Sequence, residues 1–150
     1  MSMRIEQKLA VDASRLSDID RFLITTGAKP LHPDREVVSM YFDTPTLRLY
    51  HDSNEGSVPR IKVRIRCYAP CSHTVEPHQW EVKTSSVEGR HKTTRPVTEL
   101  AQVLEHGVIW PEHGLLQPTA VVCYSRSYYA VAGVRLTVDR DITYRAASYD

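Results

Sequence analysis

Hydrophobic and polar residues alternate along several short segments of the chain, and this is the period of a half-buried β-strand. The clearest segment is residues 58–68, where aliphatic and basic side chains take turns. The same alternation runs through residues 3–11, and β-branched and aromatic residues fill residues 35–42. Three more strands are predicted at residues 78–84, at 118–130 and, after a tight connection around Gly133, at 133–145.

A helical period replaces the alternation over residues 14–26, where apolar side chains fall on one face. Asp12 or Ser14 can cap the start of this helix, because their side chains accept hydrogen bonds from free backbone N–H groups. Gly27 and Pro30 follow the last apolar position, so we expect the helix to end there.

Two shorter helical segments are predicted further along. Residues 43–50 read as a capped helical turn, because Pro45 suits the first position of a helix. Residues 97–106 read as a short helix that Gly107 ends. Residues 85–95 are polar and basic, and we expect a loop there that is partly extended.

Strands that follow one another through short links, with few helices between them, favour an antiparallel α+β fold. The length of 150 residues and the number of strands suit one domain built as a β-barrel over residues 1–150. No apolar run is long enough for a transmembrane helix, and the first residues lack the apolar core of a secretory signal. Three cysteines, an odd number, favour reduced thiols and a cytoplasmic location.

The charges are balanced overall, at a net +1, which excludes a general coat for polyanions. They are nevertheless clustered on one strand. Arg60, Lys62, Arg64 and Arg66 occupy alternate positions, so one face of the strand is cationic and the other is aliphatic. A polar face turned to water is the simpler interpretation of any single strand. Four like charges on one face repel one another, however, and such repulsion is relieved by a bound anion.

The faces that carry these cations also hold a few acids, namely Glu6, Glu81 and Asp139. Pairing with neighbouring cations is the simpler expectation for each of them. The alternative is that they hold Mg²⁺ or Mn²⁺ next to phosphate oxygens, since hard divalent ions prefer carboxylates. The chain has no Gly-x-x-x-x-Gly-Lys loop, which argues against a P-loop nucleotidase, and its seven histidines show no metal-ligand spacing.

Several segments, in order, resemble the VTC domain, the polyphosphate-polymerase branch of the triphosphate tunnel metalloenzyme (CYTH-like) superfamily. The most specific of them are Tyr41-Phe42-Asp43-Thr44-Pro45 and the Lys-x-Arg-x-Arg pattern of residues 62–66. The first strand carries Arg4 where the triphosphatase branch usually has Glu, and this resembles the VTC version. The remaining segments are Glu81-Val-Lys83, Lys92 with Arg95, residues 124–129 and residues 134–139.

The resemblance implies a tunnel of antiparallel strands with basic walls, flanked by a few helices, that binds ATP or polyphosphate with Mn²⁺ or Mg²⁺. It implies that the transferred phosphoryl group is clamped by Arg64, Arg66, Arg126 and Arg135. It implies that further phosphates are bound by Lys8, Lys62, Lys83, Lys92, Arg95 and Tyr124. Glu6, and after it Glu81, are the carboxylates expected to hold the metal.

Members of the family continue past the segment that resembles residues 134–139 with another strand and a late lysine, whereas this sequence ends at Asp150. We therefore expect a tunnel that is incomplete at the C-terminal end, and we expect anion binding more firmly than polymerase activity. The alternatives are a non-catalytic module that senses polyphosphate, inositol phosphate or nucleotide, and a triphosphatase. A nucleic-acid binder is the weakest alternative, and homo-oligomers are left open.

Overall fold

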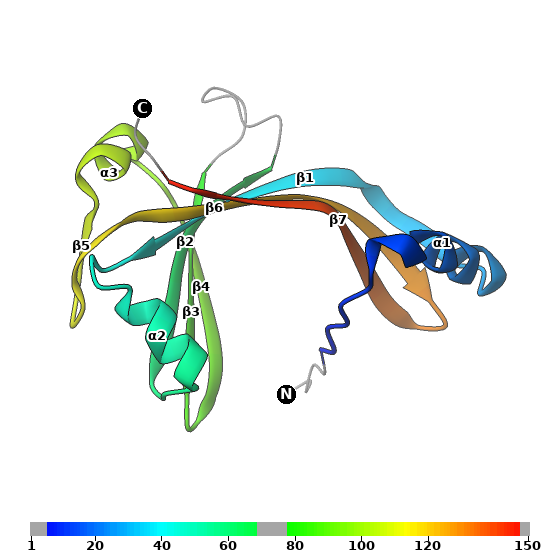
Figure 1. The fold of residues 1–150 in the computed structure, drawn as a ribbon, viewed down its shortest axis with the longest axis horizontal. Coiled ribbons are helices and arrows are strands. Elements are labelled where there is room, and N and C mark those ends of the chain that lie inside the picture. Colours follow the sequence, from blue (N-terminus) through cyan, green and yellow to red (C-terminus); the bar gives the residue numbers. More distant parts are fainter. Residues whose placement is uncertain (1–5, 69–77, 148–150) are drawn as a thin grey trace. The chain divides into compact units, whose positions relative to one another are not determined.

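The protein is described here from a computed structural model, which covers residues 6–68 and 78–147 (Figure 1). The chain divides into two compact units, and each is described by itself. Unit 1 consists of residues 1–33 and 128–137, and unit 2 consists of residues 34–127 and 138–150. The prediction of one domain over residues 1–150 stays a prediction.

Unit 1 contains a short 3₁₀ helix, η1 (Ala13–Arg15), that leads into helix α1 (Leu16–Thr25). The carboxylate of Asp12 accepts a 2.8 Å hydrogen bond from the backbone N–H of Ser14 and so caps η1, whereas α1 follows Arg15 without a side-chain cap. Gly27 follows the helix with a φ of 65°, a backbone conformation that residues with a Cβ rarely adopt. The helix predicted over residues 14–26 is therefore confirmed.

The strand predicted over residues 3–11 is wrong for the part that the structure describes. Residues 6–11 are exposed and form no strand. Alternation is only a pattern of side chains, and an extended segment becomes a strand when its backbone groups find a partner. Residues 3–5 of this prediction lie outside the described residues.

The strands pair in the order β4-β3-β2-β1-β6-β5, with β7 also paired to β6. The pairs β1–β2, β2–β3, β3–β4 and β5–β6 are all antiparallel, which confirms the antiparallel α+β fold. The bounds are β1 Lys29–Asp43, β2 Arg60–Tyr68, β3 Gln79–Ser86, β4 Gly89–Pro96, β5 Val108–Trp110, β6 Gly114–Val131 and β7 Val134–Ala146.

Strand β4 corrects the loop predicted over residues 85–95. A turn at residues 87–88 joins it to β3, and all eight of its residues are exposed. A strand at the end of the sheet order, with polar residues on both faces, carries no alternation of apolar and polar residues. The hydrophobic pattern therefore could not reveal it.

One face of the sheet in unit 2 is apolar and is covered by two helices, α2 (Arg48–Glu55) and α3 (Leu100–His106) (Figure 1). The core of this face is formed by Phe42, Leu49, Val63, Ile65, Trp80 and Leu116. Residues of α3 pack against the same core. The helix predicted before Gly107 is confirmed, although it begins at Leu100.

Helix α2 begins at Arg48, later than the turn predicted around Pro45. The buried carboxylate of Asp43 decides where it begins. It accepts hydrogen bonds from the backbone N–H groups of Thr44 (2.7 Å), Leu49 (2.9 Å) and Tyr50 (2.9 Å). Asp43 therefore satisfies backbone donors at the start of this helix and fixes its position on the sheet.

Cys67 is disulfide-bonded and Cys123 is free, so the expectation of reduced thiols is wrong for Cys67. Three cysteines can form one disulfide and leave one free thiol, as they do here. Cys71 lies outside the described residues. Within residues 6–68 and 78–147, no helix is long and apolar enough to cross a membrane.

Candidate phosphate-binding face

The second face of the sheet in unit 2 carries the cations that the alternation predicts. The registers of β1, β2 and β3 place Tyr41, Arg64 and Glu81 in one cross-strand row. Ser39, Arg66 and Gln79 form the next row on the same face. This surface, together with Lys62, Lys83, Lys92, Tyr124 and Arg126, is called the cationic face below.

Glu81 is the centre of the cationic face, and its side chain is only 6% exposed. Its Oε2 accepts hydrogen bonds from both Nε (2.8 Å) and Nη2 of Arg64. Its Oε1 accepts a 2.6 Å bond from Nζ of Lys92, and Nη1 of Arg66 lies 3.6 Å from Oε2. Burial alone would raise the pKa of Glu81, but the bond from Lys92 and the contacts with both arginines lower it to about 2. Glu81 is therefore ionised and holds three cations together.

Arg64 and Arg66 are themselves buried, and neutral side chains orient them further. Nη1 of Arg64 donates a 2.9 Å hydrogen bond to the hydroxyl of Tyr41, whose ring also lies under the guanidinium at 5.7 Å. Burial works to lower the pKa of Arg64, but Tyr41 and Glu81 outweigh it and raise the value. Arg64 therefore keeps its charge although it is buried.

Arg66 connects β2 to Ser39 of β1 and Tyr124 of β6. Its Nε donates to Oγ of Ser39 at 3.1 Å, and its Nη2 donates to the hydroxyl of Tyr124 at 3.0 Å. Burial raises the pKa of Tyr124, although Arg66 and Arg126 work against this. Tyr124 is thus neutral at ordinary pH, and it can donate its own proton to an anion while it accepts from Arg66.

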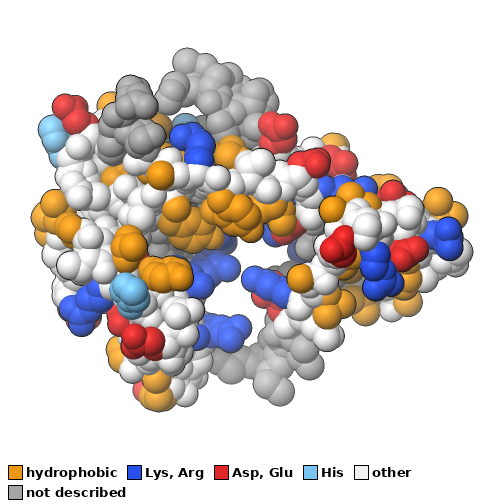
Figure 2. All heavy atoms as spheres, in the orientation of Figure 1, with side chains coloured by type: hydrophobic (Ala, Val, Ile, Leu, Met, Phe, Trp, Pro, Cys, Tyr) orange, Lys and Arg blue, Asp and Glu red, His pale blue; other side chains and the backbone are white. Residues whose placement is uncertain are grey.

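Three lysines from three strands stand side by side on the cationic face. In the sheet register Lys62 pairs with Lys83, and Lys83 pairs with Lys92. All three side chains are exposed, and like charges directly opposite each other destabilise a sheet. Figure 2 shows blue Lys and Arg side chains on the side of β2–β4 that faces away from α2. An anion that binds across this row would relieve the repulsion.

Arg126 and Asp139 form a two-pronged ion pair between β6 and β7. Nε and Nη2 of Arg126 donate to the two carboxylate oxygens of Asp139, at 2.6 and 2.8 Å. The guanidinium also lies 5.1 Å from the ring centre of Tyr124. Of the predicted site residues, the structure therefore brings together Arg64, Arg66, Lys62, Lys83, Lys92, Glu81, Tyr124 and Arg126.

Arg95 does not join this group. It pairs in register with Trp80, a residue of the apolar core, so its side chain leaves the sheet on the face opposite Arg64. Its guanidinium lies over the ring of Trp110 at 5.6 Å. Lys92 and Arg95 are three residues apart, and an odd spacing on a strand places two side chains on opposite faces.

Three other predicted residues belong to unit 1, namely Glu6, Lys8 and Arg135. All three are exposed, and Nζ of Lys8 lies 3.9 Å from a carboxylate oxygen of Glu6. Their predicted roles stay predictions. The pairing of acids with nearby cations, which was the simpler expectation, is confirmed for Glu6, Glu81 and Asp139.

Glu81 does not fit the role of metal ligand in this arrangement. Both of its oxygens already accept hydrogen bonds from cations, and a divalent ion there would face the charges of Arg64, Arg66 and Lys92. Among the described residues, no three His, Cys, Asp or Glu side chains lie close enough together to hold a metal ion. Glu6 remains as the predicted carboxylate for this role.

Ser39 and Tyr41 are not among the predicted site residues, although Tyr41 begins the Tyr41–Pro45 motif and Ser39 lies two positions before it. Each orients one arginine through a single hydrogen bond. Ser39, Tyr41 and the two arginines each alternate with apolar residues along their own strands. The register between β1 and β2 is what brings them together. Pairing between strands that are far apart in sequence cannot be read from either strand alone.

A family model described as the VTC domain matches residues 3–110. A crystal structure of a Bacillus halodurans protein, provisionally named an adenylate cyclase, is similar at 12% identity and a TM-score of 0.49. That similarity covers 81% of this chain and 72% of the other. None of the curated proteins matches the chain.

Proposed function

Because the chain belongs to the VTC domain family, we propose that its cationic face binds the phosphates of ATP or polyphosphate and serves a polyphosphate-polymerase type of phosphoryl transfer. The observation that carries the proposal is the row of three lysines beside two buried, oriented arginines. Cations that lie side by side on one face attract an oligophosphate, whose several negative charges can contact them together.

The charge of the central cluster supports a ligand with several phosphates. Arg64, Arg66 and Lys92 carry three positive charges, and Glu81 neutralises one of them. The cluster therefore keeps a charge of about +2, to which Lys62 and Lys83 add on the same face. Arginines fork onto phosphate oxygens, while lysines act as point charges that tolerate different positions along a phosphate chain.

The roles within the transfer follow from this arrangement. Phosphoryl transfer needs little covalent chemistry from a protein, so positioning and neutralisation of charge supply most of the rate. Arg64 and Arg66 are held by Glu81, Tyr41 and Ser39, and they would clamp the phosphoryl group that moves. The lysine row would align the rest of the phosphate chain. Arg126 is proposed to join this clamp, and the roles of Arg135 and Lys8, which belong to unit 1, stay as the sequence predicts.

Mn²⁺ or Mg²⁺ belongs to the proposal as a companion of the phosphates. Such ions usually keep several waters and are bound through one or two carboxylates together with phosphate oxygens. Glu6 is the proposed protein ligand, because Glu81 is already held by cations. We expect EDTA to leave the affinity for tripolyphosphate unchanged and to abolish turnover. A loss of tripolyphosphate binding in EDTA would contradict the proposal that the cationic face binds phosphates without a metal ion.

A non-catalytic sensor of polyphosphate, inositol phosphate or nucleotide is the second candidate. The engagement of Glu81 by three cations favours it, because this carboxylate is then not available to a metal. A triphosphatase is the third alternative, and it would use the same face to release phosphate into water.

One assay separates these functions. The protein is incubated with ATP and Mn²⁺, and both polyphosphate and free phosphate are measured over time. We expect polyphosphate, whereas free phosphate alone identifies a triphosphatase and no product with retained binding identifies a sensor. If neither tripolyphosphate nor ATP raises the melting temperature of the protein, the proposal fails in all three forms.

A further inference from the structure

The apolar face of the sheet in unit 2 carries a pocket of about 450 Å³, which neither the helices nor the core fills. Trp80 and Val82 of β3 lie at its base, and Thr93 and Arg95 of β4 form one side. The segment of residues 109–111 forms the other side. The volume falls in the range of sites that take small molecules.

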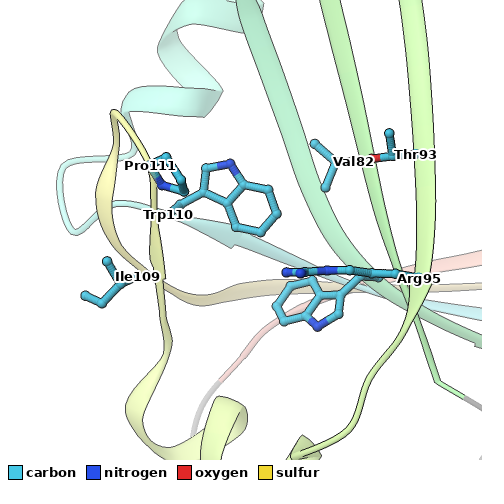
Figure 3. A pocket seen from close by; sticks show the side chains of 7 residues that line it. Val82, Thr93, Arg95, Ile109, Trp110 and Pro111 are labelled. Carbon is cyan, nitrogen blue, oxygen red and sulfur yellow. The ribbon is translucent and has the colours of Figure 1, made fainter.

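Aromatic surface dominates this pocket. The rings of Trp80 and Trp110 lie 6.2 Å apart between centroids, at an angle of 50°. Figure 3 shows the Trp110 side chain pointing from its segment towards β3 and β4, and Arg95 reaching back from β4 across the same space. Indole rings at this distance present faces and edges on which a third aromatic ring can pack.

The polar groups in the pocket suit an anion. Among the residues that the structure describes, Arg95 has no carboxylate partner, and its guanidinium only stacks on Trp110. The hydroxyl of Thr93 also points into this space (Figure 3). The guanidinium of Arg95 thus offers charged N–H donors, and the hydroxyl of Thr93 offers a neutral donor. No acid lines the pocket.

We propose that this pocket is a second ligand site, separate from the cationic face, that binds a small aromatic carboxylate. The ring of the ligand packs against the apolar wall of Ile109, Trp110 and Pro111, and its carboxylate accepts hydrogen bonds from Arg95 and Thr93. A phosphate chain is a poor fit here, since the walls are mostly apolar and supply a single cation.

The sequence makes the test simple, because Trp80 and Trp110 are the two tryptophans of the chain. Their fluorescence therefore reports on the walls of this pocket. The protein is titrated with 3-phenylpropionate and, separately, with the neutral 3-phenylpropionamide. We expect a saturable change in emission with the acid and about tenfold weaker binding of the amide, because a charge-assisted pair is lost.

Two variants complete the test. Arg95→Gln is expected to weaken binding of the acid about tenfold. Arg90→Gln, the same change at an exposed position of the same strand on the other face, is expected to leave it unchanged. The indole N–H signals of both variants in NMR spectra confirm that the pocket is folded. No saturable change with the acid, equal affinity for acid and amide, or equal binding by the two variants would overturn the proposal.

Discussion

Arg66 and Arg95 lie on opposite faces of the same sheet, and their surroundings differ in every respect. Arg66 is buried, lies 3.6 Å from the carboxylate of Glu81, and donates to Ser39 and Tyr124. Arg95 is exposed and rests on the ring of Trp110. One guanidinium is held in place by hydrogen bonds and charge, and the other only by stacking.

This difference shows that the face of the sheet from which an arginine side chain extends decides which groups it can contact. Both arginines lie in basic segments of the sequence. Because successive side chains of a strand point to opposite faces, one arginine lies among cations and the other lies beside the apolar core. The cationic face is organised around one buried acid. The apolar face offers a cation to whatever enters its pocket. Each prediction below separates these two settings.

Removing the buried acid should have the largest effect. Glu81→Gln leaves Arg64, Arg66 and Lys92 without their counter-charge, and we expect the free energy of unfolding to fall by about 3 kcal/mol at pH 7. Asp139→Asn removes the acid of a partly exposed pair and should cost about 1 kcal/mol or less. Urea unfolding of both variants measures the difference, and equal losses would contradict the central role of Glu81.

The stability difference between the wild type and Glu81→Gln should depend on pH. The pKa of Glu81 is about 2 in the folded protein, below the value near 4.3 of an unfolded chain. A lowered pKa stabilises the fold above about pH 5, and this stabilisation is lost as the pH falls towards 2. The gap in unfolding free energy between the wild type and Glu81→Gln should therefore narrow as the pH falls through this window. A constant gap would refute the pairing.

Exchanging one arginine on each face tests the comparison directly. Arg66→Gln should weaken tripolyphosphate binding about 30-fold, because charged hydrogen bonds to phosphate are lost. Arg95→Gln removes the same charge from the opposite face and should leave the affinity unchanged. Isothermal titration calorimetry measures both, and a similar loss in the two variants would mean that only net charge matters.

A smaller loss is expected from Tyr41→Phe. This change keeps the ring under Arg64 but removes the 2.9 Å hydrogen bond that orients its Nη1. We expect tripolyphosphate binding to weaken about fivefold, the cost of one such bond. Tyr144→Phe, at a residue that is 74% exposed, is the matched control. An unchanged affinity in Tyr41→Phe would show that Glu81 alone positions Arg64.

The smallest effects are expected in the lysine row, where one substitution should raise the stability of the unliganded protein and lower its affinity for tripolyphosphate. Lys62→Gln relieves repulsion with Lys83, so the unliganded protein should become more stable by about 0.5 kcal/mol. Tripolyphosphate should then bind about threefold more weakly, since one point charge is missing. Melting temperatures with and without tripolyphosphate measure both effects, and Lys29→Gln is the control. If Lys62→Gln is less stable than the wild type without ligand, Lys62 and Lys83 do not repel each other as proposed.

Part of this arrangement could be predicted from the sequence. Alternation over residues 60–66 was enough to separate the cationic face from the aliphatic one, because period two belongs to a single strand. The faces of residues 89–96 could not be predicted, since an exposed strand with polar residues on both sides has no hydrophobic pattern. Arg95 was therefore grouped with Lys92, although the spacing already places them on opposite faces once a strand is known.

Register was the other quantity that the sequence could not supply. Glu81 was recognised as an acid among cations, but its contact with Arg64, Arg66 and Lys92 depends on how three strands align. Ser39 and Tyr41 were missed for the same reason. The alternation over residues 3–11 failed in the opposite way, because its described part finds no partner strand.

The central claim is that phosphates bind on the face of Arg64 and Arg66. NMR signals of the arginine Nε–Hε groups test it most directly, recorded while tripolyphosphate is added to the protein. We expect the signals of Arg64 and Arg66 to shift together and to saturate, and the signal of Arg95 to stay in place. A saturating shift of Arg95 with Arg64 and Arg66 unchanged would place the phosphates on the wrong face and contradict the account.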